Sequence, residues 1–473
     1  MLFNSFEFIC FFPIVFILYW LLKKSQYQNI LLTVASYVFY GWWDWRFLFL
    51  IAFSSILDYT LALGIHRSTI LKSRKLLLTA SIIANIGILG FFKYFNFFID
   101  SFSQLLTSVG ISDNYSSLNI ILPVGISFYT FQTLSYTIDV YRKKIDAVKN
   151  PVTFFTYVSF FPQLVAGPIE RSTNLIPQFS NERSFFPKLA SDGLRQILWG
   201  LLKKVVIADN CAIVANQIFD SPSNTHSAVL ILGMVLFAFQ IYGDFSGYSD
   251  IAIGTSKLLG IRLMTNFKYP YFAQNISEFW QRWHISLSSW FKDYVYIPLG
   301  GNRCSQWKTA RNISIVFLLS GLWHGANWTF VAWGAIHALL YIPIVMFFKP
   351  NKKTPSNWRV FLNTLATFST ICITWVFFRA ESISEAFLYF KYTVTGINIP
   401  VSEVTYFIKE TARLPLIGII VMLIIEWIQR EKNHALEINN IKRPAIRYLI
   451  YYLLIYLIWQ YGGTQQDFIY FQF

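Results

Sequence analysis

Long apolar segments recur along this chain from residue 6 to residue 462, and they constrain its fold more than any other feature. About 20 consecutive apolar residues are enough for a helix to cross a lipid bilayer. Charged residues make up only 13% of the chain, against roughly 25% in a soluble domain. The sequence therefore predicts an all-α polytopic membrane protein. It excludes a soluble enzyme, a disordered chain and a nucleic-acid-binding protein.

Hydropathy predicts about 11–12 spans when the segments are counted by length. The apolar segment 152–166 is short and interrupted by Pro162, Gly167 and Pro168, which favours a re-entrant segment over a full crossing. There is no internal repeat or long linker, so we expect one integral-membrane domain over residues 1–473, with a motif-bearing core at 119–347. The predicted spans lie near 6–22, 28–41, 46–64, 76–99, 119–139, 191–208, 226–243, 312–327, 328–347, 360–378, 414–429 and 446–462.

Lys and Arg residues gather in short connecting segments, whereas residues 100–118 contain none. Short loops rich in Lys and Arg stay in the cytoplasm, so we expect 100–118 and the N terminus on the outer side. The stretch 8–22 has no basic region before it and no cleavage site after it, which predicts a retained span. The segments predicted to be cytoplasmic are 23–28, 66–75, 141–150, 349–359 and 430–447.

The longest polar interruption, 265–311, mixes cations with tryptophans and predicts an amphipathic helix at the cytoplasmic interface. Arg282, Lys292 and Arg303 could hold the phosphates of a cytosolic ligand, with Gly300-Gly301 letting backbone amides approach it. A basic helix resting on anionic lipid explains the same residues, and the sequence leaves both interpretations open.

Among the six histidines, His324 stands out because it lies in GLWHGANW (321–328), inside an apolar hairpin. Irregular backbone at membrane depth survives only where protein buries it or where it lines a wet cavity, and an ionisable residue there is a functional candidate. The alternative is a structural histidine that ties two helices together. That structural interpretation is favoured for His337. A third histidine, His284, follows Trp283 and the basic residue Arg282 directly in the sequence.

The stretch GDFSGYSDIAIG (243–254) places polar side chains beside an apolar span, which is costly unless they face a polar cavity. We therefore expect a tunnel lining made of Asp244, Ser246, Tyr248 and Asp250, together with Trp323 and Asn327 beside His324. The four cysteines lie far apart without C-x-x-C spacing, so neither a metal site nor a disulfide framework is expected.

The chain contains no G-x-S-x-G elbow, H-E-x-x-H pair or Walker loop, which weakens serine hydrolase, zinc protease and ATP-driven pump hypotheses. A buried histidine beside a cavity remains. A neutral imidazole, with a reference pKa of ~6.5, can accept a hydroxyl proton at physiological pH. An acyl transfer from a thioester to a hydroxyl needs little more than that base and a path for each substrate.

Several motifs together resemble the membrane-bound O-acyltransferase superfamily, and within it the branch of alginate O-acetyltransferase membrane subunits. The principal pair is RWHISLSSWFKDYVYIPLGGNR, followed some twenty residues later by GLWHGANW. The supporting pieces are PVGISFYTFQ (123–132), FPQLVAGPIERS (161–172), YGDFSGYSDIAIG (242–254) and the terminal DFIYFQF (467–473).

The resemblance implies a helical membrane fold with a central tunnel, in which His324 matches the family's invariant histidine and His284 its second motif histidine. It implies transfer from a cytosolic donor, acetyl-CoA in this branch, with no bound cofactor. The expected acceptor is a polysaccharide outside the bacterial inner membrane, reached with an extracytoplasmic or membrane-anchored acetyltransferase partner. We also expect the protein to contact membrane lipid.

Other functions stay open at this point. D-alanyl transfer to teichoic acid and O-acetylation of peptidoglycan use similar membrane proteins within the superfamily. A transporter or flippase could use Asp244, Asp250 and His324 as a substrate path, although the inverted repeat expected of one is not apparent. A purely structural scaffold leaves the glycine-flanked His324 unexplained.

Overall fold

The computed structural model describes residues 1–111, 118, 120–347, 356–396 and 400–469, and the regular secondary structure of these residues is entirely helical. The predicted all-α class is confirmed. Parts of four predicted segments lie outside the described residues. They are 112–117 in the predicted outer loop, 119 in the predicted span 119–139, 349–355 in the predicted basic loop and 470–473 in the terminal motif.

The chain divides into two compact units, each of which is described by itself. Unit 1 comprises Met1–Ser191 and Thr255–Met264, and unit 2 comprises Asp192–Gly254 and Thr265–Phe473. The single domain over residues 1–473 stays a prediction. Both predicted histidine motifs fall within unit 2.

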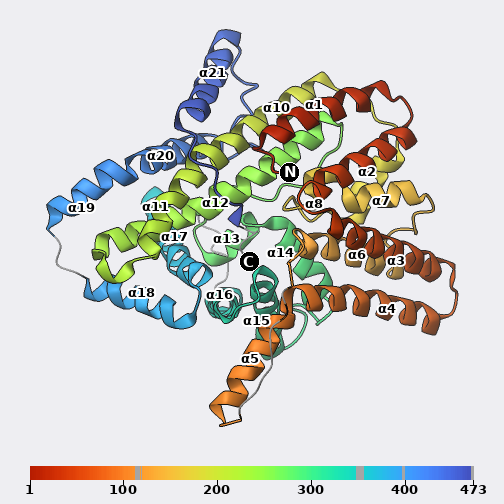
Figure 1. Ribbon diagram of the computed structural model, residues 1–473, viewed down its shortest axis with the longest axis horizontal. Coiled ribbons are helices and arrows are strands. Elements are labelled where there is room, and N and C mark those ends of the chain that lie inside the picture. Colours follow the sequence, from red (N-terminus) through yellow and green to blue (C-terminus); the bar gives the residue numbers. More distant parts are fainter. Residues whose placement is uncertain (112–117, 119, 348–355, 397–399, 470–473) are drawn as a thin grey trace. The chain divides into compact units, whose positions relative to one another are not determined.

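Unit 1 consists of helices that pair through polar as well as apolar contacts. The Asp58 carboxylate accepts hydrogen bonds from Ser81 Oγ (2.5 Å) and Asn85 Nδ2 (2.8 Å), which joins α3 to α4. Such bonds favour helix association where lipid provides no hydrophobic driving force. The helices are α1 (Phe6–Leu21), α2 (Ser25–Gly41), α3 (Leu48–Arg67), α4 (Leu71–Leu89), α5 (Phe95–Ser108), α6 (Ile126–Tyr141), α7 (Pro151–Ser159), α8 (Phe161–Leu164) and α9 (Ser172–Ser180), as Figure 1 shows.

Unit 2 is built around the long helix α12, whose central part is buried among its neighbours. Its helices are the greater parts of α10 (Pro187–Leu201) and α12 (Ser227–Leu258), together with α11 (Asp209–Phe219), α13 (Ile276–Arg282), α14 (Ile285–Phe291), α15 (Gln306–His324), α16 (Trp328–Phe347), α17 (Asn357–Arg379), α18 (Ile383–Thr395), α19 (Val401–Phe407), α20 (Arg413–Ile428) and α21 (Pro444–Tyr461).

Short 3-10 and π-helical segments interrupt or extend these helices. The 3-10 segments are η1 (Trp45–Phe47), η4 (Pro222–Asn224) and η5 (Pro270–Phe272). The π-helical segments are η2 (Gly90–Tyr94), η3 (Leu202–Ala208), η6 (Lys292–Tyr296) and η7 (Ile408–Ala412). Because π-helical turns occur mostly as local insertions at functional sites, η3 and η6 are of interest for the site in unit 2.

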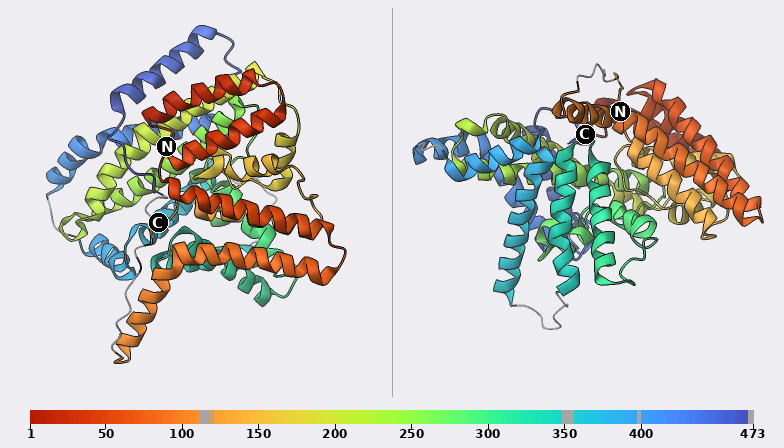
Figure 2. Two further views of the ribbon diagram at one scale, coloured as in Figure 1. Left: turned by 45° about the vertical axis from the view of Figure 1, so that its right-hand side comes forward. Right: turned by 90° about the horizontal axis from the view of Figure 1, so that it is seen from below.

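The predicted hairpin over 312–347 is confirmed as α15 and α16, which run side by side with α17 next to α16 (Figure 2). Small residues permit this close approach. A Cβ added at Gly321 would lie 3.0 Å from the carbonyl carbon of Phe330, and one at Gly334 would lie 3.1 Å from that of Phe317. Glycines thus let the two helix backbones meet.

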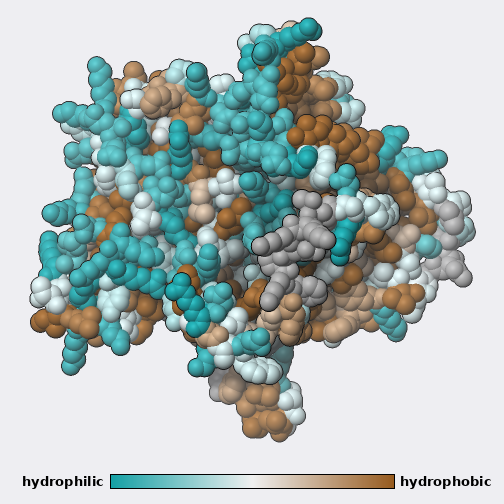
Figure 3. All heavy atoms as spheres, turned by 180° about the vertical axis from the view of Figure 1, so that it is seen from behind, coloured by the Kyte–Doolittle hydropathy of each residue, from teal (hydrophilic) through white to brown (hydrophobic). Residues whose placement is uncertain are grey.

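Six helical segments of the described residues are long and apolar enough to cross a membrane, so the chain is a multi-pass membrane protein. They are Trp45–Arg67, Leu71–Ser108, Ser227–Leu258, Trp328–Phe347, Asn357–Arg379 and Ser402–Ile428. The six are about half of the number that hydropathy predicts, because several predicted spans form shorter helices. Large apolar side chains are exposed along such helices, and Figure 3 shows apolar surface beside hydrophilic surface on one face.

Two predicted segments differ in the structure. Residues 100–108, expected in an outer loop, are helical, because α4 continues through η2 into α5. The amphipathic helix expected within 265–311 is also wrong. That segment forms the short helices α13 and α14, and Trp280, Trp283 and Trp290 are buried in protein instead of facing the interface.

Candidate active site

His324 is the last residue of α15, and its side chain is only 2% exposed. Aromatic rings surround the imidazole, with ring centroids 5.0 Å away in Trp323, 5.2 Å in Trp333 and 5.3 Å in Phe378. These rings keep bulk water from the imidazole and hold it at the turn of the hairpin. His324 therefore lies at the turn of the predicted hairpin, and its role as a base stays a prediction.

His284 lies between α13 and α14 with a positive φ of 43°, and its side chain is completely buried. The ring centroids of His284 and His324 are 6.4 Å apart, so the structure brings the two predicted histidines together. Phe245 on α12 packs edge-on against the His284 ring at 4.6 Å. Burial lowers the pKa of His284 to about 3, which keeps its imidazole neutral at physiological pH.

Of the two settings that the sequence left open for the backbone beside His324, the structure shows burial in protein at both glycines. A Cβ added at Gly325 would overlap the ring of Phe330, and one added at Gly321 would overlap the Phe330 carbonyl group. Neighbouring protein therefore fills the space that the missing side chains leave. The two glycines fix the turn of the hairpin and hence the position of His324.

His337 has the structural role that the sequence favours. The Trp280 indole Nε1 donates a hydrogen bond to His337 Nδ1 (3.3 Å), which ties α13 to α16. Trp280 and Phe317 link His337 to a neighbouring pocket, because both side chains form part of the wall of that pocket.

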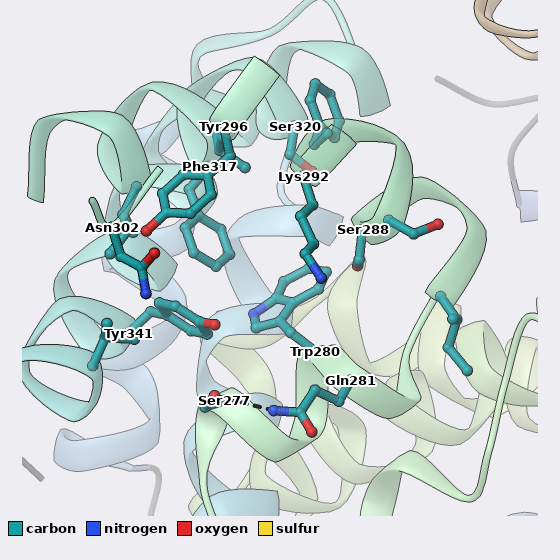
Figure 4. A pocket seen from close by; sticks show the side chains of 16 residues that line it. Ser277, Trp280, Gln281, Ser288, Lys292, Tyr296, Asn302, Phe317, Ser320 and Tyr341 are labelled. Carbon is teal, nitrogen blue, oxygen red and sulfur yellow. Dashed lines mark hydrogen bonds between the residues drawn. The ribbon is translucent and has the colours of Figure 1, made fainter. Parts of the chain in front are cut away.

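This pocket has a volume of about 540 Å³ and lies between the α13–α14 segment and the α15–α16 hairpin (Figure 4). Most of its lining is apolar, and Lys292 is the cation among its lining residues. Ser320 on α15 also lines it, one helical turn before His324. The lining residues are Ser277, Trp280, Gln281, Ile285, Ser288, Ser289, Phe291, Lys292, Tyr296, Asn302, Ile313, Val316, Phe317, Ser320, Tyr341 and Val345.

Of the three cations predicted to bind the donor, the structure places one in this pocket. Lys292, at the start of η6, is exposed and lines it. Arg282 instead forms an ion pair with Glu278 one turn earlier, and Arg303 lies exposed in the turn after η6, outside the pocket lining.

The backbone amides of Gly300 and Gly301 are already used within their own turn. They donate to the carbonyl oxygens of Ile297 (3.0 Å) and Tyr296 (2.9 Å) respectively. An amide that donates inside the turn has no hydrogen left for a phosphate oxygen. The predicted approach of these amides to a ligand is therefore wrong for this conformation.

The acidic residues of GDFSGYSDIAIG take part in a buried ion-pair network. Asp244 Oδ1 lies 2.8 Å from Lys204 Nζ, and Lys204 also contacts Asp209 at 2.8 Å. Asp244 Oδ2 accepts a hydrogen bond from the backbone N–H of Ile469 (2.7 Å), which holds the C-terminal segment against α12. Buried charges of opposite sign thus compensate one another within the protein.

The other three residues of the stretch have equally specific contacts. Lys203 Nζ lies 2.6 Å from Asp250 and donates to Ser246 Oγ (2.8 Å). Tyr248 packs against Phe468, with ring centroids 5.0 Å apart. These residues lie in one buried cluster on α12, and their role as a tunnel lining stays a prediction.

Trp323 and Asn327 differ in their relation to the histidines. Trp323 is buried, and its ring centroid is 5.6 Å from that of His284 and 5.0 Å from that of His324. Asn327 caps α16, because its Oδ1 accepts from the backbone N–H of Thr329 (2.9 Å), and its Nδ2 donates to the Glu381 carbonyl (2.8 Å).

The sequence interpretation missed Lys203, Lys204 and Asn266. The two lysines lie within the predicted span 191–208 and were not singled out, because their placement in the buried η3 has no sequence signature. Asn266 lies 18 residues before His284 and contacts it, a long-range relation that spacing does not show. Within the described part of the chain, no cluster of three or more His, Cys, Asp or Glu side chains could hold a metal ion.

Comparison with known proteins agrees with this helical membrane architecture. The profile of the membrane-bound O-acyltransferase family matches residues 47–379, which include both histidines. The probable alginate O-acetylase AlgI of Azotobacter vinelandii is 42% identical over 82% of this chain and 76% of its own length. Its counterpart in Pseudomonas aeruginosa is 41% identical over 82% of this chain and 73% of its own length.

Two other relatives are also similar to this chain. The peptidoglycan O-acetyltransferase of Helicobacter pylori is 33% identical over 100% of this chain and 98% of its own length. The teichoic acid D-alanyltransferase of Bacillus subtilis is 32% identical over 56% of this chain and 70% of its own length.

Proposed function

Because the chain belongs to the membrane-bound O-acyltransferase family, we propose that it transfers an acetyl group across the membrane from cytosolic acetyl-CoA to a hydroxyl of a polysaccharide outside. The observation that carries the proposal is the buried pair His324 and His284, with ring centroids 6.4 Å apart at the turn of a membrane hairpin. The 41–42% identity to alginate O-acetylases supports acetyl as the group transferred.

His324 serves as the general base in this proposal. Its imidazole takes the hydroxyl proton as the acceptor oxygen attacks the thioester carbonyl and forms the new C–O bond. The C–S bond then breaks, and the same proton passes to the departing sulfur, which leaves as the thiol of coenzyme A. The imidazole returns to its neutral form, so no further reactant is needed.

The donor reaches this base through the pocket between α13–α14 and α15–α16. Lys292 is placed to contact a donor phosphate, while the apolar walls suit the narrow acyl-bearing arm. Ser320 lines the pocket on α15, one turn from His324. Trp333 contacts both Trp280 of the pocket wall and His324, so this ring lies between the pocket wall and the proposed base.

The relatives' names suggest candidate acceptors, and the family resemblance suggests a partner. An alginate-like polysaccharide is our first candidate, and the bacterial inner membrane is the compartment that places such an acceptor opposite a cytosolic donor. An extracytoplasmic or membrane-anchored acetyltransferase is the expected partner. Peptidoglycan is the second candidate acceptor, because the Helicobacter relative aligns over the full length of this chain, beyond the 82% that the alginate relatives cover.

The test is acetylation of the envelope polysaccharide in cells that carry His324→Ala as their only copy. Loss of a general base lowers the rate by about 10²–10⁴-fold, and we expect this loss with near-normal protein abundance. His66→Ala, at the end of α3 in unit 1, is the matched control and keeps wild-type acetylation. Wild-type acetylation by abundant His324→Ala protein would contradict the proposal.

A further inference from the structure

Asn266 is held by contacts that define the orientation of its amide group. Its Oδ1 accepts hydrogen bonds from the backbone N–H of Ser286 (3.2 Å) and from Ser286 Oγ (2.9 Å). Its Nδ2 donates to Ser249 Oγ on α12 (3.2 Å). A backbone N–H can only donate, so the amide atom that faces Ser286 must be the oxygen.

The same Oδ1 lies 3.1 Å from His284 Nδ1. An amide oxygen has no hydrogen to donate, so a hydrogen bond between these atoms requires the hydrogen to be on Nδ1. In a neutral imidazole only one ring nitrogen carries a hydrogen, which leaves the lone pair on Nε2. Ser286 Oγ also lies 3.4 Å from His284 Nδ1, and because it donates its hydrogen to Asn266 Oδ1 it can only accept from Nδ1. The contacts around the Asn266 amide thus select one of the two tautomers.

The backbone reinforces this arrangement on both sides of the histidine. The N–H of Ile285 donates to the Asn266 carbonyl (2.9 Å), and the N–H of Lys268 donates to the Arg282 carbonyl (2.9 Å). The segment 266–268 is therefore fixed along 282–285, where His284 has its positive φ. Ser249 anchors the other end of the Asn266 amide to the buried helix α12.

We propose that Asn266 is a positioning residue, which keeps His284 in the Nδ1–H tautomer and thereby presents Nε2 as its basic nitrogen. The inference deepens the proposed function, because it assigns His284 the part of a proton or hydrogen-bond acceptor beside His324. Asn266 acts through His284 and makes no contact with substrate in this account.

The surroundings of His284 keep its imidazole neutral, so the property that matters is which ring nitrogen carries the hydrogen. Aromatic rings from α12, from segment 266–268 and from α15 pack against it: Phe245, Phe267 and Trp323. A fourth ring contact comes from His324, which is itself titratable. Burial lowers the pKa of His284 to about 3, so the neutral imidazole is the form present during turnover.

The direct test is ¹⁵N spectroscopy of purified protein with ¹⁵N-labelled histidine, with the His284 signals assigned by their loss in His284→Gln. We expect a protonated Nδ1 and an unprotonated Nε2 in the wild-type protein, and a mixture of tautomers in Asn266→Ala. Asn85→Ala, which removes a buried amide from unit 1, keeps the wild-type spectrum. A protonated Nε2 in the wild-type protein would overturn the inference even if Asn266→Ala fails to fold.

Kinetics separate positioning from a merely structural role. Asn266→Ala lowers kcat at least tenfold while the KM for acetyl-CoA changes less than twofold, because the altered side chain does not contact the donor. Asn266→Asp keeps the acceptor oxygen but adds a negative charge that favours imidazolium, so the acid limb of its pH–kcat profile moves to higher pH. Wild-type kcat in Asn266→Ala, or an unmoved acid limb in folded Asn266→Asp, contradicts the inference.

The outcomes also distinguish this inference from the proposed function on which it rests. If the wild-type spectrum shows Nδ1–H and Asn266→Ala loses it, while the purified protein never consumes acetyl-CoA, the positioning stands and the proposed donor fails. If acetyl transfer is measured but the tautomer is Nε2–H, the proposed function stands and the positioning fails.

Discussion

Gly321→Ala should misplace His324 without removing any functional group. The added Cβ would lie 3.0 Å from the carbonyl carbon of Phe330 and 3.5 Å from the Cα of Gly334, and it would overlap the Phe330 oxygen. Non-bonded carbons prefer a separation of about 3.5–4.0 Å, so α15 and α16 must move apart by roughly 0.5–1 Å. The obstructing atoms belong to backbone, so no side-chain rotation relieves the overlap.

The expected effect is larger on activity than on folding. Overpacking of this kind destabilises a protein by about 1–3 kcal/mol. A displacement of about 1 Å at a catalytic group lowers the rate by roughly 10²-fold. Because Gly321 precedes His324 by less than one helical turn, we expect folded protein with about 1% of wild-type transfer.

The assay is transfer of radiolabelled acetyl from acetyl-CoA to envelope polymer by membranes from cells that produce each variant, normalised to the amount of protein. Gly87→Ala is the matched control, because a Cβ at that position of α4 meets nothing within 4 Å. Its activity stays at the wild-type level. If Gly321→Ala is equally active, the hairpin contact does not set the position of His324.

Two further predictions concern the donor pocket and the stability of unit 1. Lys292→Gln should raise the KM for acetyl-CoA about tenfold, since a charged hydrogen bond is lost, whereas Arg303→Gln, outside the pocket lining, should leave it unchanged. Steady-state kinetics decide this, and equal effects would contradict the assignment of Lys292. Burial raises the pKa of Glu170 to about 7 from its ordinary 4.5, so the folded chain binds this proton more tightly than the unfolded chain. The resulting stabilisation is complete below pH 4.5 and is lost as the pH rises through 7. The Tm of the wild-type protein should therefore fall between about pH 5 and pH 8 more than that of Glu170→Gln, and parallel pH profiles would contradict this.

Sequence reasoning found the residues whose chemistry conflicts with their surroundings. His324 could be predicted because an ionisable group between two glycines is unusual in an apolar hairpin, and the structure places it at that turn. The resemblance identified His324 and His284 as motif histidines but did not predict that they meet, and their 40-residue separation contains no geometric information.

The remaining features depend on long-range packing that a local pattern does not encode. The tryptophans of 279–290 alternate with cations as on an interfacial helix, yet tertiary contacts bury them. Hydropathy predicts more spans than the six long apolar helical segments of the described residues, because it does not show where a helix ends or where a π-helical segment such as η3 begins. Lys204 was missed because its partners Asp244 and Gln466 come from distant parts of the chain.

The most direct test of transmembrane transfer uses purified protein in oriented proteoliposomes, with acetyl-CoA confined to one face and acceptor polysaccharide and partner confined to the other. We expect acetylated polysaccharide only when acetyl-CoA is on the cytoplasmic face, the side assigned to loops such as 66–75 and 430–447, and none with His324→Ala. Acetylation with acetyl-CoA confined to the outer face, and none with acetyl-CoA on the cytoplasmic face, would contradict it.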